Sequence, residues 1–310
     1  MAKRRFSPHK RRAITALEDA AREQLGPSAN VGRLQWLGEG TARKAWFAVI
    51  DAPGGSEHVW VAQVPPADTS KEALDRFARE LALLGALADL DLPFHTPAPI
   101  TSVEVDGIPI NITTACDGAA LDVRMRIFTA AEAAQFTGEV AAAIHRLPTH
   151  LPLPGKAHRT CREDALHDMS ALRDIDAPFV DELEAWCTEH LPPDDLPSCV
   201  VHGDLLGQNL LLTWERAVSV IDWEYAGLGS PAGDLAIVTR GHRKVFRDED
   251  GRAMLLDAYN AKADRPVRPA DLRLRELTLM AFQVAEFLRE YPHSGPTELN
   301  KLKNLYKRPV

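Results

Sequence analysis

Apolar and polar positions alternate along the first third of the chain. The stretches LQWLGEG, AWFAVID and HVWVAQV, between residues 31 and 66, are rich in aromatic and β-branched residues, and APGGSE interrupts them. Alternation with a period of two is typical of strands with one buried face, whereas glycine and proline mark turns. The pattern predicts three antiparallel strands with a loop at 53–57. It also predicts strands at 100–105 and 108–114 that turn at Asp106-Gly107.

Elsewhere, apolar residues recur every three or four positions, which is the period of an α-helix. One such pattern covers residues 13–25. A second follows Thr69 and Glu72, and a third follows Thr129 and Glu132. Each pair has the spacing of a capping box, in which two residues satisfy each other's backbone N–H groups at the start of a helix. We therefore expect helices to begin after Thr69 and after Thr129.

The strand patterns end near residue 115, and helical patterns follow them. Strands and helices segregated in this way predict an α+β protein with two lobes and a cleft between them. Residues 1–115 would form a small lobe built on an antiparallel sheet, with a basic arm and a leading helix at 1–29. Residues 116–310 would form a larger and mostly helical lobe.

Charge and composition narrow the possible functions. The chain has a net charge of −8, and the basic opening segment MAKRRFSPHKRR is interpreted as a solvated arm. Nucleic-acid binders need clustered positive charge, so that class is excluded, whereas an acidic surface suits a cationic ligand. The sequence has neither an apolar run of about 18 residues nor a secretory signal. We expect a cytoplasmic protein with no membrane partner and with reduced cysteines.

Two polar inserts between short apolar runs carry the strongest chemical signal. Residues 200–212 read VVHGDLLGQNLLL, and residues 218–227 read VSVIDWEYAG. The flanking apolar runs predict a tight loop that holds Asp204 and Asn209, and a strand that ends at Asp222. These oxygen-bearing side chains suit phosphoryl transfer, because Mg²⁺ prefers oxygen ligands and a carboxylate can orient an acceptor hydroxyl. The alternative is that they are turn formers and a strand cap.

Four short motifs follow one another along the chain, and two of them lie in these polar inserts. They are Ala143-Ile144-His145-Arg146-Leu147-Pro148, His202-Gly203-Asp204-x4-Asn209, Ile221-Asp222-Trp223-Glu224 and Gly229-Ser230-Pro231-x-x-Asp234-Leu235-Ala236. Together they resemble the aminoglycoside phosphotransferase and choline kinase-like family of the protein kinase-like superfamily. The resemblance covers residues 30–245 and implies a two-lobed protein kinase-like fold, with a nucleotide-binding first lobe and a catalytic, acceptor-binding second lobe.

The resemblance also implies roles for single residues. Asp204 would be the catalytic residue that orients the acceptor hydroxyl and takes its proton late in the reaction. Asn209 and Asp222 would hold Mg²⁺, and ATP or GTP would be the phosphate donor. His202 and Asp234 would brace the catalytic loop through hydrogen bonds.

One expected residue is missing from the third strand. Kinase folds place a lysine or arginine there, which holds the nucleotide phosphates and pairs with a glutamate of the next helix. Glu80 is the candidate glutamate, since it borders the apolar face of its helix, but Gln63 stands where the cation is expected. We hypothesise that Arg43 or Lys44 supplies the cation from the second strand, as in the with-no-lysine protein kinases. The alternative is that both are solvated charges.

Further nucleotide contacts are expected from backbone groups. Gly38 and Gly40, in the segment GEGTARK, resemble a glycine-rich phosphate loop, although a simple turn would read the same. A hinge at Thr114 to Cys116 would contact the base through its backbone, which leaves ATP and GTP as equal alternatives.

The acceptor is predicted from charge. Acidic residues dominate the segment 156–195, which in the resembling family lines the acceptor pocket. They are Glu163, Asp164, Asp168, Asp174, Asp176, Asp181, Glu182, Glu184, Glu189, Asp194 and Asp195. A negative wall would attract a cationic, aminoglycoside-like acceptor, although solvated helix faces explain the same charges. The predicted function is Mg²⁺-dependent phosphorylation of a small hydroxylated molecule. The alternatives are a kinase for choline, homoserine or a sugar, and a catalytically silent nucleotide-binding protein.

Overall fold

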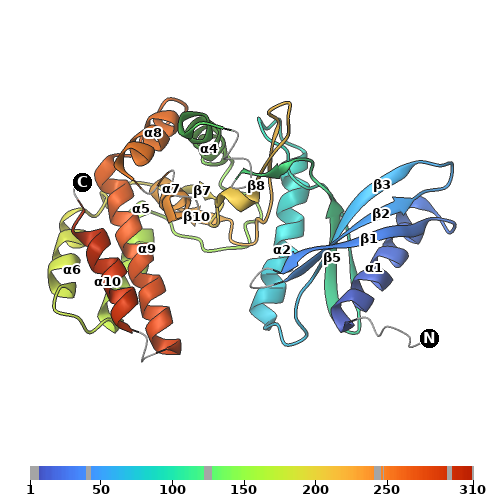
Figure 1. Ribbon diagram of the computed structural model, residues 1–310, viewed down its shortest axis with the longest axis horizontal. Helices are drawn as coiled ribbons and strands as arrows, with labels where there is room; N and C mark the ends of the chain where they lie inside the picture. The colour runs from blue at the N-terminus through green and yellow to red at the C-terminus, as the bar shows by residue number, and fades with distance from the viewer. Residues whose placement is uncertain are drawn as a thin grey trace. The chain divides into compact units, whose positions relative to one another are not determined.

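Five antiparallel strands form the sheet that the alternating pattern predicts (Figure 1). The strands are β1 (Asn30–Glu39), β2 (Lys44–Asp51), β3 (Glu57–Val64), β4 (Pro99–Val105) and β5 (Ile108–Thr114), in the sheet order β1-β2-β3-β5-β4. The turn between β4 and β5 has φ angles of 55° at Asp106 and 74° at Gly107. Two consecutive positive φ angles are typical of the tight hairpin that this dipeptide predicts.

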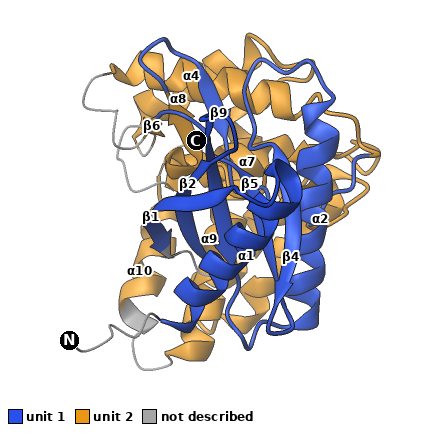
Figure 2. Cartoon of the chain, turned by 90° about the vertical axis from the view of Figure 1, so that its right-hand side faces the viewer, with its two compact units in different colours: residues 1–118, 151–154, 213–224 blue, residues 119–150, 155–212, 225–310 orange. Residues whose placement is uncertain are grey.

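The structure is a computed structural model that describes residues 7–39, 43–121, 128–240, 246, 248–291 and 295–308. The chain divides into two compact units, which Figure 2 distinguishes by colour. Unit 1 comprises residues 1–118, 151–154 and 213–224, and unit 2 comprises residues 119–150, 155–212 and 225–310. Unit 1 contains the five-stranded sheet and unit 2 is mostly helical, so the predicted α+β class is confirmed.

Helix α1 (Pro8–Leu25) packs on one face of the sheet in unit 1. Its small residues and Leu17 are buried against Trp46, Ile50 and Trp60, because alternate residues of β2 and β3 point to the same face. The helix begins earlier than the pattern at 13–25 predicts, since the Ser7 side chain caps it and Pro8 occupies its first turn. The later part of the basic segment is therefore helical, and residues 1–6 lie outside the described residues.

Helix α2 (Lys71–Ala88) packs against β4 and β5. Its N-cap is Ser70, whose side chain accepts a hydrogen bond from Ala73 N, so the predicted capping box at Thr69 is wrong. The Thr69 hydroxyl instead donates to the Pro66 carbonyl oxygen at 2.7 Å. Two adjacent hydroxyl residues compete for the cap, and the local turn decides between them. The capping box at Thr129 and Glu132 is confirmed.

Unit 2 consists of helices around two short antiparallel ladders. The helices are α4 (Ala130–Ile144), α5 (Cys161–Met169), α6 (Val180–Glu189), α7 (Pro231–Arg240), α8 (Glu249–Asn260), α9 (Pro269–Glu290) and α10 (Gly295–Tyr306), with short 3₁₀ turns at Ser170–Asp174 and Gly207–Asn209. The ladders pair β7 (Cys199–Val201) with β10 (Gly227–Gly229), and β6 (Ala119–Ala120) with β8 (Leu210–Leu212). Helices α5, α6, α9 and α10 share one hydrophobic core. Among the described residues, no helix combines the length and the apolar character that a membrane span requires.

The helices α4 and α8 approach each other closely at Gly138. A Cβ atom at this position would lie 2.6 Å from the Tyr259 backbone nitrogen and 2.9 Å from the Ala258 carbonyl carbon. Backbone atoms of a packed helix cannot move aside without moving the helix. Glycine is therefore required at this position by the distance between the helices.

Gly138→Ala is expected to lower the free energy of unfolding by about 2 kcal/mol. Overpacking costs about 1–3 kcal/mol, and the higher helix propensity of alanine offsets at most about 1 kcal/mol of that. Urea denaturation followed by circular dichroism measures the change. Gly85→Ala on α2 is the matched control, because its Cβ would meet only Pro99 Cγ at 3.7 Å. The control should be as stable as the wild type or slightly more stable, and equal stability of both variants would contradict the close approach.

Candidate active site

In unit 2, a single buried carboxylate holds the backbone of the predicted catalytic loop. Asp234, in the first turn of α7, accepts hydrogen bonds from His202 N at 2.7 Å and from Gly203 N at 2.8 Å. Gly203 has a φ of 81°, and a Cβ atom there would lie 2.3 Å from the Tyr225 carbonyl oxygen. The loop can follow this path because residue 203 is glycine. The Asp234 carboxylate therefore binds two consecutive backbone N–H groups of this loop.

The contacts of Asp234 extend to His145, the C-cap residue of α4, and through it to Tyr259 of α8. His145 Nε2 lies 3.2 Å from Asp234 Oδ2, and His145 Nδ1 lies 2.9 Å from the Tyr259 hydroxyl. Burial favours the neutral form of Asp234, but the contacts with His145 and His202 outweigh it and lower the pKa of the carboxyl group. The role of Tyr259 was not predicted from the sequence. His145 lies in one of the four motifs, whereas Tyr259 carries no local signal.

Asp204 and Asn209 lie side by side in this loop. Asn209 Nδ2 donates to Asp204 Oδ2 at 2.9 Å and to the Asp204 carbonyl oxygen at 2.8 Å. His202 is fully buried, and its Nδ1 accepts a hydrogen bond from Asp204 N at 3.3 Å. His202 therefore contacts the backbone of the loop from a buried position, and the bracing role predicted for it stays a prediction. The donation by Nδ2 also fixes the orientation of the Asn209 amide and leaves its Oδ1 as the atom suited to a cation.

In unit 1, the described end of the glycine-rich segment carries a buried arginine. The Arg43 side chain is 7% exposed, and Glu80 on α2 is 2% exposed. The two side chains form a bidentate ion pair, in which Arg43 Nη2 donates to Glu80 Oε1 at 3.0 Å and Nη1 donates to Oε2. Arg43 Nη2 also donates to Asp222 Oδ1. One guanidinium group therefore joins the glutamate of the helix to the predicted metal ligand.

Gln63 lies at the edge of this arrangement. Its Oε1 atom accepts a hydrogen bond from Arg43 Nη1 at 3.5 Å, so the arginine side chain reaches the position on β3 where a cation is expected. Burial opposes the charge of Arg43, but Glu80 and Asp222 outweigh it and raise the pKa of the guanidinium group. Of the two cations hypothesised for this role, Arg43 makes these contacts. Lys44 is the first residue of β2 and is half-buried.

The segment after β9 (Val218–Val220) turns sharply at Asp222. Asp222 has a φ of 69°, an uncommon value for a residue other than glycine. The turn is held by Trp223, which is fully buried and whose backbone nitrogen donates to Glu80 Oε1 at 3.1 Å. Burial raises the pKa of the next residue, Glu224, to about 7. Glu80 thus has two partners and is a buried residue of its helix.

The remaining predicted nucleotide contacts are less defined. Gly38 lies in β1 beside a register shift, and a Cβ atom there would meet no other atom within 4 Å. Gly40 lies outside the described residues. Thr114 N donates to the Ala98 carbonyl oxygen at 2.9 Å, so its N–H group is already used within unit 1. Burial raises the pKa of the Cys116 thiol to about 11, and the thiol is therefore protonated at neutral pH.

The acid-rich segment 156–195 makes many internal contacts. Buried Asp164 and Asp168 both pair with Arg275, at 3.1 Å and 2.9 Å. Glu163 completes the capping box of α5. Ion pairs at the surface join Asp174 to Arg289 and Asp194 to Arg162. The composition of this segment is therefore weaker support for a cationic acceptor than the sequence indicated.

The fold is shared with a protein of known structure. The structure of a macrolide 2′-phosphotransferase from Brachybacterium faecium matches with a TM-score of 0.66 at 20% sequence identity, over 96% of this chain and 99% of that one. At this level of identity the likeness shows a shared fold. The protein kinase-like fold that the four motifs predict is confirmed.

Sequence comparison identifies the family. The profile of the phosphotransferase enzyme family matches residues 34–277. Viomycin phosphotransferase from Streptomyces vinaceus is 30% identical over 218 residues, which are 63% of this chain and 73% of that protein. Acyl-CoA dehydrogenase family member 11 from Gallus gallus is 38% identical over 76 residues, which are 24% of this chain but 10% of that protein.

The chain therefore belongs to the phosphotransferase enzyme family. The prediction of an enzyme of the phosphotransferase class is confirmed, and so is the resemblance on which it was based.

Proposed function

We propose that the protein transfers the γ-phosphate of ATP or GTP to a hydroxyl group of a small molecule, with Mg²⁺ as the metal ion. In this proposal Asp204 is the catalytic residue, Asn209 and Asp222 are metal ligands, and Arg43 binds the nucleotide phosphates. The first lobe predicted from the sequence would serve the nucleotide, and the second would serve the acceptor.

The ion pairs of Arg43 carry this proposal. The silent alternative was motivated by the neutral Gln63 in place of a cation on the third strand. Arg43 instead provides a guanidinium group next to Gln63, paired with the helix glutamate Glu80. A group that binds phosphate bidentately and keeps its charge when buried is suited to this task. The missing third-strand cation therefore no longer argues against catalysis.

The donor atoms of the chain fit Mg²⁺. This ion is usually bound by one or two carboxylates together with the phosphates of its nucleotide, and it keeps several waters. The carboxylate of Asp222 and the oriented Oδ1 of Asn209 are oxygen donors of this kind. When bound, the ion would neutralise charge that develops on the phosphates. The Asp204 carboxylate would orient the acceptor hydroxyl and accept its proton.

The acceptor is proposed from the relatives and from charge. Two of the proteins named above are phosphotransferases for viomycin and for macrolides, which supports a hydroxyl-bearing small molecule such as an antibiotic. A cationic, aminoglycoside-like acceptor is supported by the net charge of −8. The internal ion pairs of the segment 156–195 weaken that support.

Phosphoryl transfer is expected to require both a divalent cation and an acceptor. The purified protein would be incubated with ATP or GTP and with a panel of antibiotics, amino alcohols, hydroxy acids and sugars, and products would be read by mass spectrometry. We expect one class of acceptor to gain the mass of a phosphoryl group with Mg²⁺, and no product when EDTA removes the metal. Nucleotide binding without product across the panel, and without nucleotide hydrolysis, would favour the silent alternative.

A further inference from the structure

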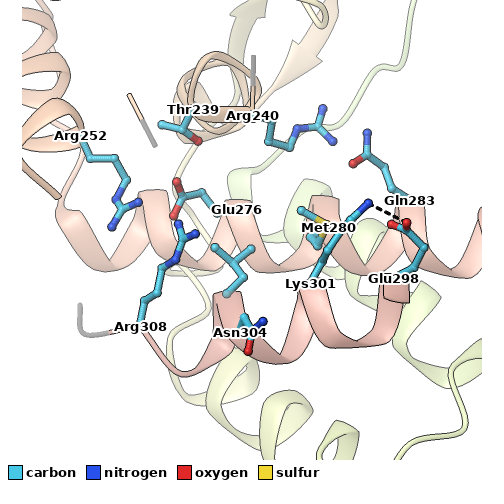
Figure 3. A pocket seen from close by; sticks show the side chains of 11 residues that line it. Thr239, Arg240, Arg252, Glu276, Met280, Gln283, Glu298, Lys301, Asn304 and Arg308 are labelled. Carbon is cyan, nitrogen blue, oxygen red and sulfur yellow. Dashed lines mark hydrogen bonds and ion pairs between the residues drawn. The ribbon is translucent and has the colours of Figure 1, made fainter. Parts of the chain in front are cut away.

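Unit 2 contains a concave site where the last turn of α7 meets α8, α9 and α10 (Figure 3). The pocket has a volume of about 490 Å³, which is within the usual range for small-molecule sites. Side chains from all four helices point into it (Figure 3). None of the catalytic, metal-binding or nucleotide-binding residues predicted from the sequence lines this pocket. The pocket is therefore a second candidate binding site in unit 2.

Positive charge dominates the lining of the pocket. Among the described residues, the charged ones that line it are the cations Arg240, Arg252, Lys301 and Arg308 and the carboxylates Glu276 and Glu298. The lining thus has an excess of two positive charges, on a chain whose net charge is −8. A local field opposite in sign to that of the whole chain indicates a ligand with negative charge.

Both carboxylates of the lining lie beside cations. Glu298 is paired with Lys301 at 2.6 Å. Glu276 lies 3.9 Å from buried Arg273, and Figure 3 shows the side chains of Arg252 and Arg308 pointing toward the same carboxylate. Burial lowers the pKa of Arg273, and the charges of Arg252 and Arg308 lower it further against the opposing effect of Glu276. One carboxylate therefore faces three guanidinium groups.

Helix α7 joins this pocket to the loop of Asp204. Its first turn holds Asp234, which binds the loop backbone, and its last turn holds Thr239 and Arg240, which line the pocket. Six residues of α-helix span about 9 Å, a distance that a small molecule can bridge. Burial lowers the pKa of Arg240, and the charges of Asp204 and Asp168 oppose this change. Helix α7 thus connects the backbone of the loop that holds Asp204 to the lining of the pocket.

We propose that this pocket binds an acid group of the acceptor, a carboxylate or a phosphate, while the hydroxyl group of the acceptor lies at Asp204. The acceptor would then be a hydroxylated acid, which differs from the polycation expected from the net charge. The inference rests on the proposed function for the role of Asp204. The binding of an acid group by the pocket can be tested without turnover.

The test uses inorganic phosphate and malonate as probes of the 310-residue chain. Thermal stability is measured across a titration of each anion for the wild type and for Arg252→Glu and Arg308→Ala. Arg252 lies in the first turn of α8, where an acidic residue is compatible with the helix. Lys303→Glu is the matched control, because Lys303 is an exposed residue of α10 outside the pocket lining.

We expect both anions to stabilise the wild type and the control equally. The apparent Kd for each anion should rise at least about tenfold in Arg252→Glu and severalfold in Arg308→Ala. Changes of this size are typical when a charge-assisted hydrogen bond is lost. A preference for one anion identifies the acid group as phosphate or carboxylate. Equal stabilisation of all four proteins would overturn the inference.

Turnover separates this inference from the proposed function. Glycerol, glycerate, glycerol 3-phosphate and serinol carry hydroxyl groups with neutral, carboxylate, phosphate and cationic substituents. We expect the highest kcat/KM with an acid-bearing compound, and loss of that preference in Arg252→Glu. Anion binding without transfer to any acceptor would refute the proposed function but not the anion site. Transfer to neutral or cationic compounds with equal rates in both proteins would refute the acid-bearing acceptor but not the phosphotransferase.

Discussion

Asp204→Asn is expected to lower kcat by about 10²- to 10⁴-fold, the usual contribution of a positioned general acid or base. Asparagine has nearly the same shape as aspartate, and its Oδ1 can still accept the hydrogen bond that Asn209 Nδ2 donates at 2.9 Å. The variant removes the negative charge and the ability to accept the proton of the hydroxyl. Steady-state kinetics with the best acceptor of the panel measure the effect.

The loss should be confined to catalysis. We expect the thermal midpoint and the nucleotide Kd of Asp204→Asn to equal those of the wild type, because the loop is held by Asp234 through backbone groups. Asp181→Asn, an exposed residue of α6, provides the same chemical change away from the loop. If Asp204→Asn kept its kcat within a few-fold of this control, Asp204 would not be the catalytic residue.

Arg43→Ala is expected to lower kcat/KM by about 10²- to 10³-fold, as is typical when a preorganised group loses its interaction with transition-state charge. The substitution also leaves Glu80 buried without its bidentate partner. Removing one member of a buried ion pair costs about 3–5 kcal/mol of stability. Turnover must therefore be measured at a temperature at which the variant is folded.

A relocated charge distinguishes a loss of function from a loss of structure. Gln63→Lys in the Arg43→Ala background restores a cation beside Glu80 from the strand where kinase folds usually carry it. We expect the kcat/KM of this double variant to be at least about tenfold higher than that of Arg43→Ala. The new ammonium group would again bind phosphate and compensate the charge of the Glu80 carboxylate. Lys44→Ala is the control and should retain its turnover. Full activity of Arg43→Ala would disprove the relocated cation, and a large loss in Lys44→Ala would assign the role to Lys44.

The sheet of unit 1 was predictable because its signal is local. Alternation along β2 and β3 and the Asp106-Gly107 turn each depend on neighbouring residues, and the structure agrees with both. The start of α2 was predicted one residue too early, because Thr69 and Ser70 have equivalent side chains and the Pro66 carbonyl captures one of them. Local chemistry of this kind leaves the end of an element ambiguous by a residue or two.

The site was predictable where a motif carried it and unpredictable where partners are distant in sequence. Asp204 and Asn209 share one loop, so their spacing predicts their contact. Arg43 and Asp222 are 179 positions apart, and nothing in either segment indicates their ion pair. Tyr259 meets His145 across 114 positions, and it carries no signal that distinguishes it from a core tyrosine.

The ion pair between Arg43 and Asp222 has a thermodynamic consequence for the proposed reaction. A phosphate group that binds Arg43 would break the ion pair between Arg43 and Asp222. A cation that binds Asp222 would break the same ion pair. A phosphate alone leaves Asp222 without its partner, and a cation alone leaves Arg43 with Glu80 as its partner, whereas both ligands together compensate both charges. The affinities for nucleotide and metal ion should therefore increase each other by the same factor, as linkage requires. The pairing would make the protein bind a metal–nucleotide complex in preference to either component.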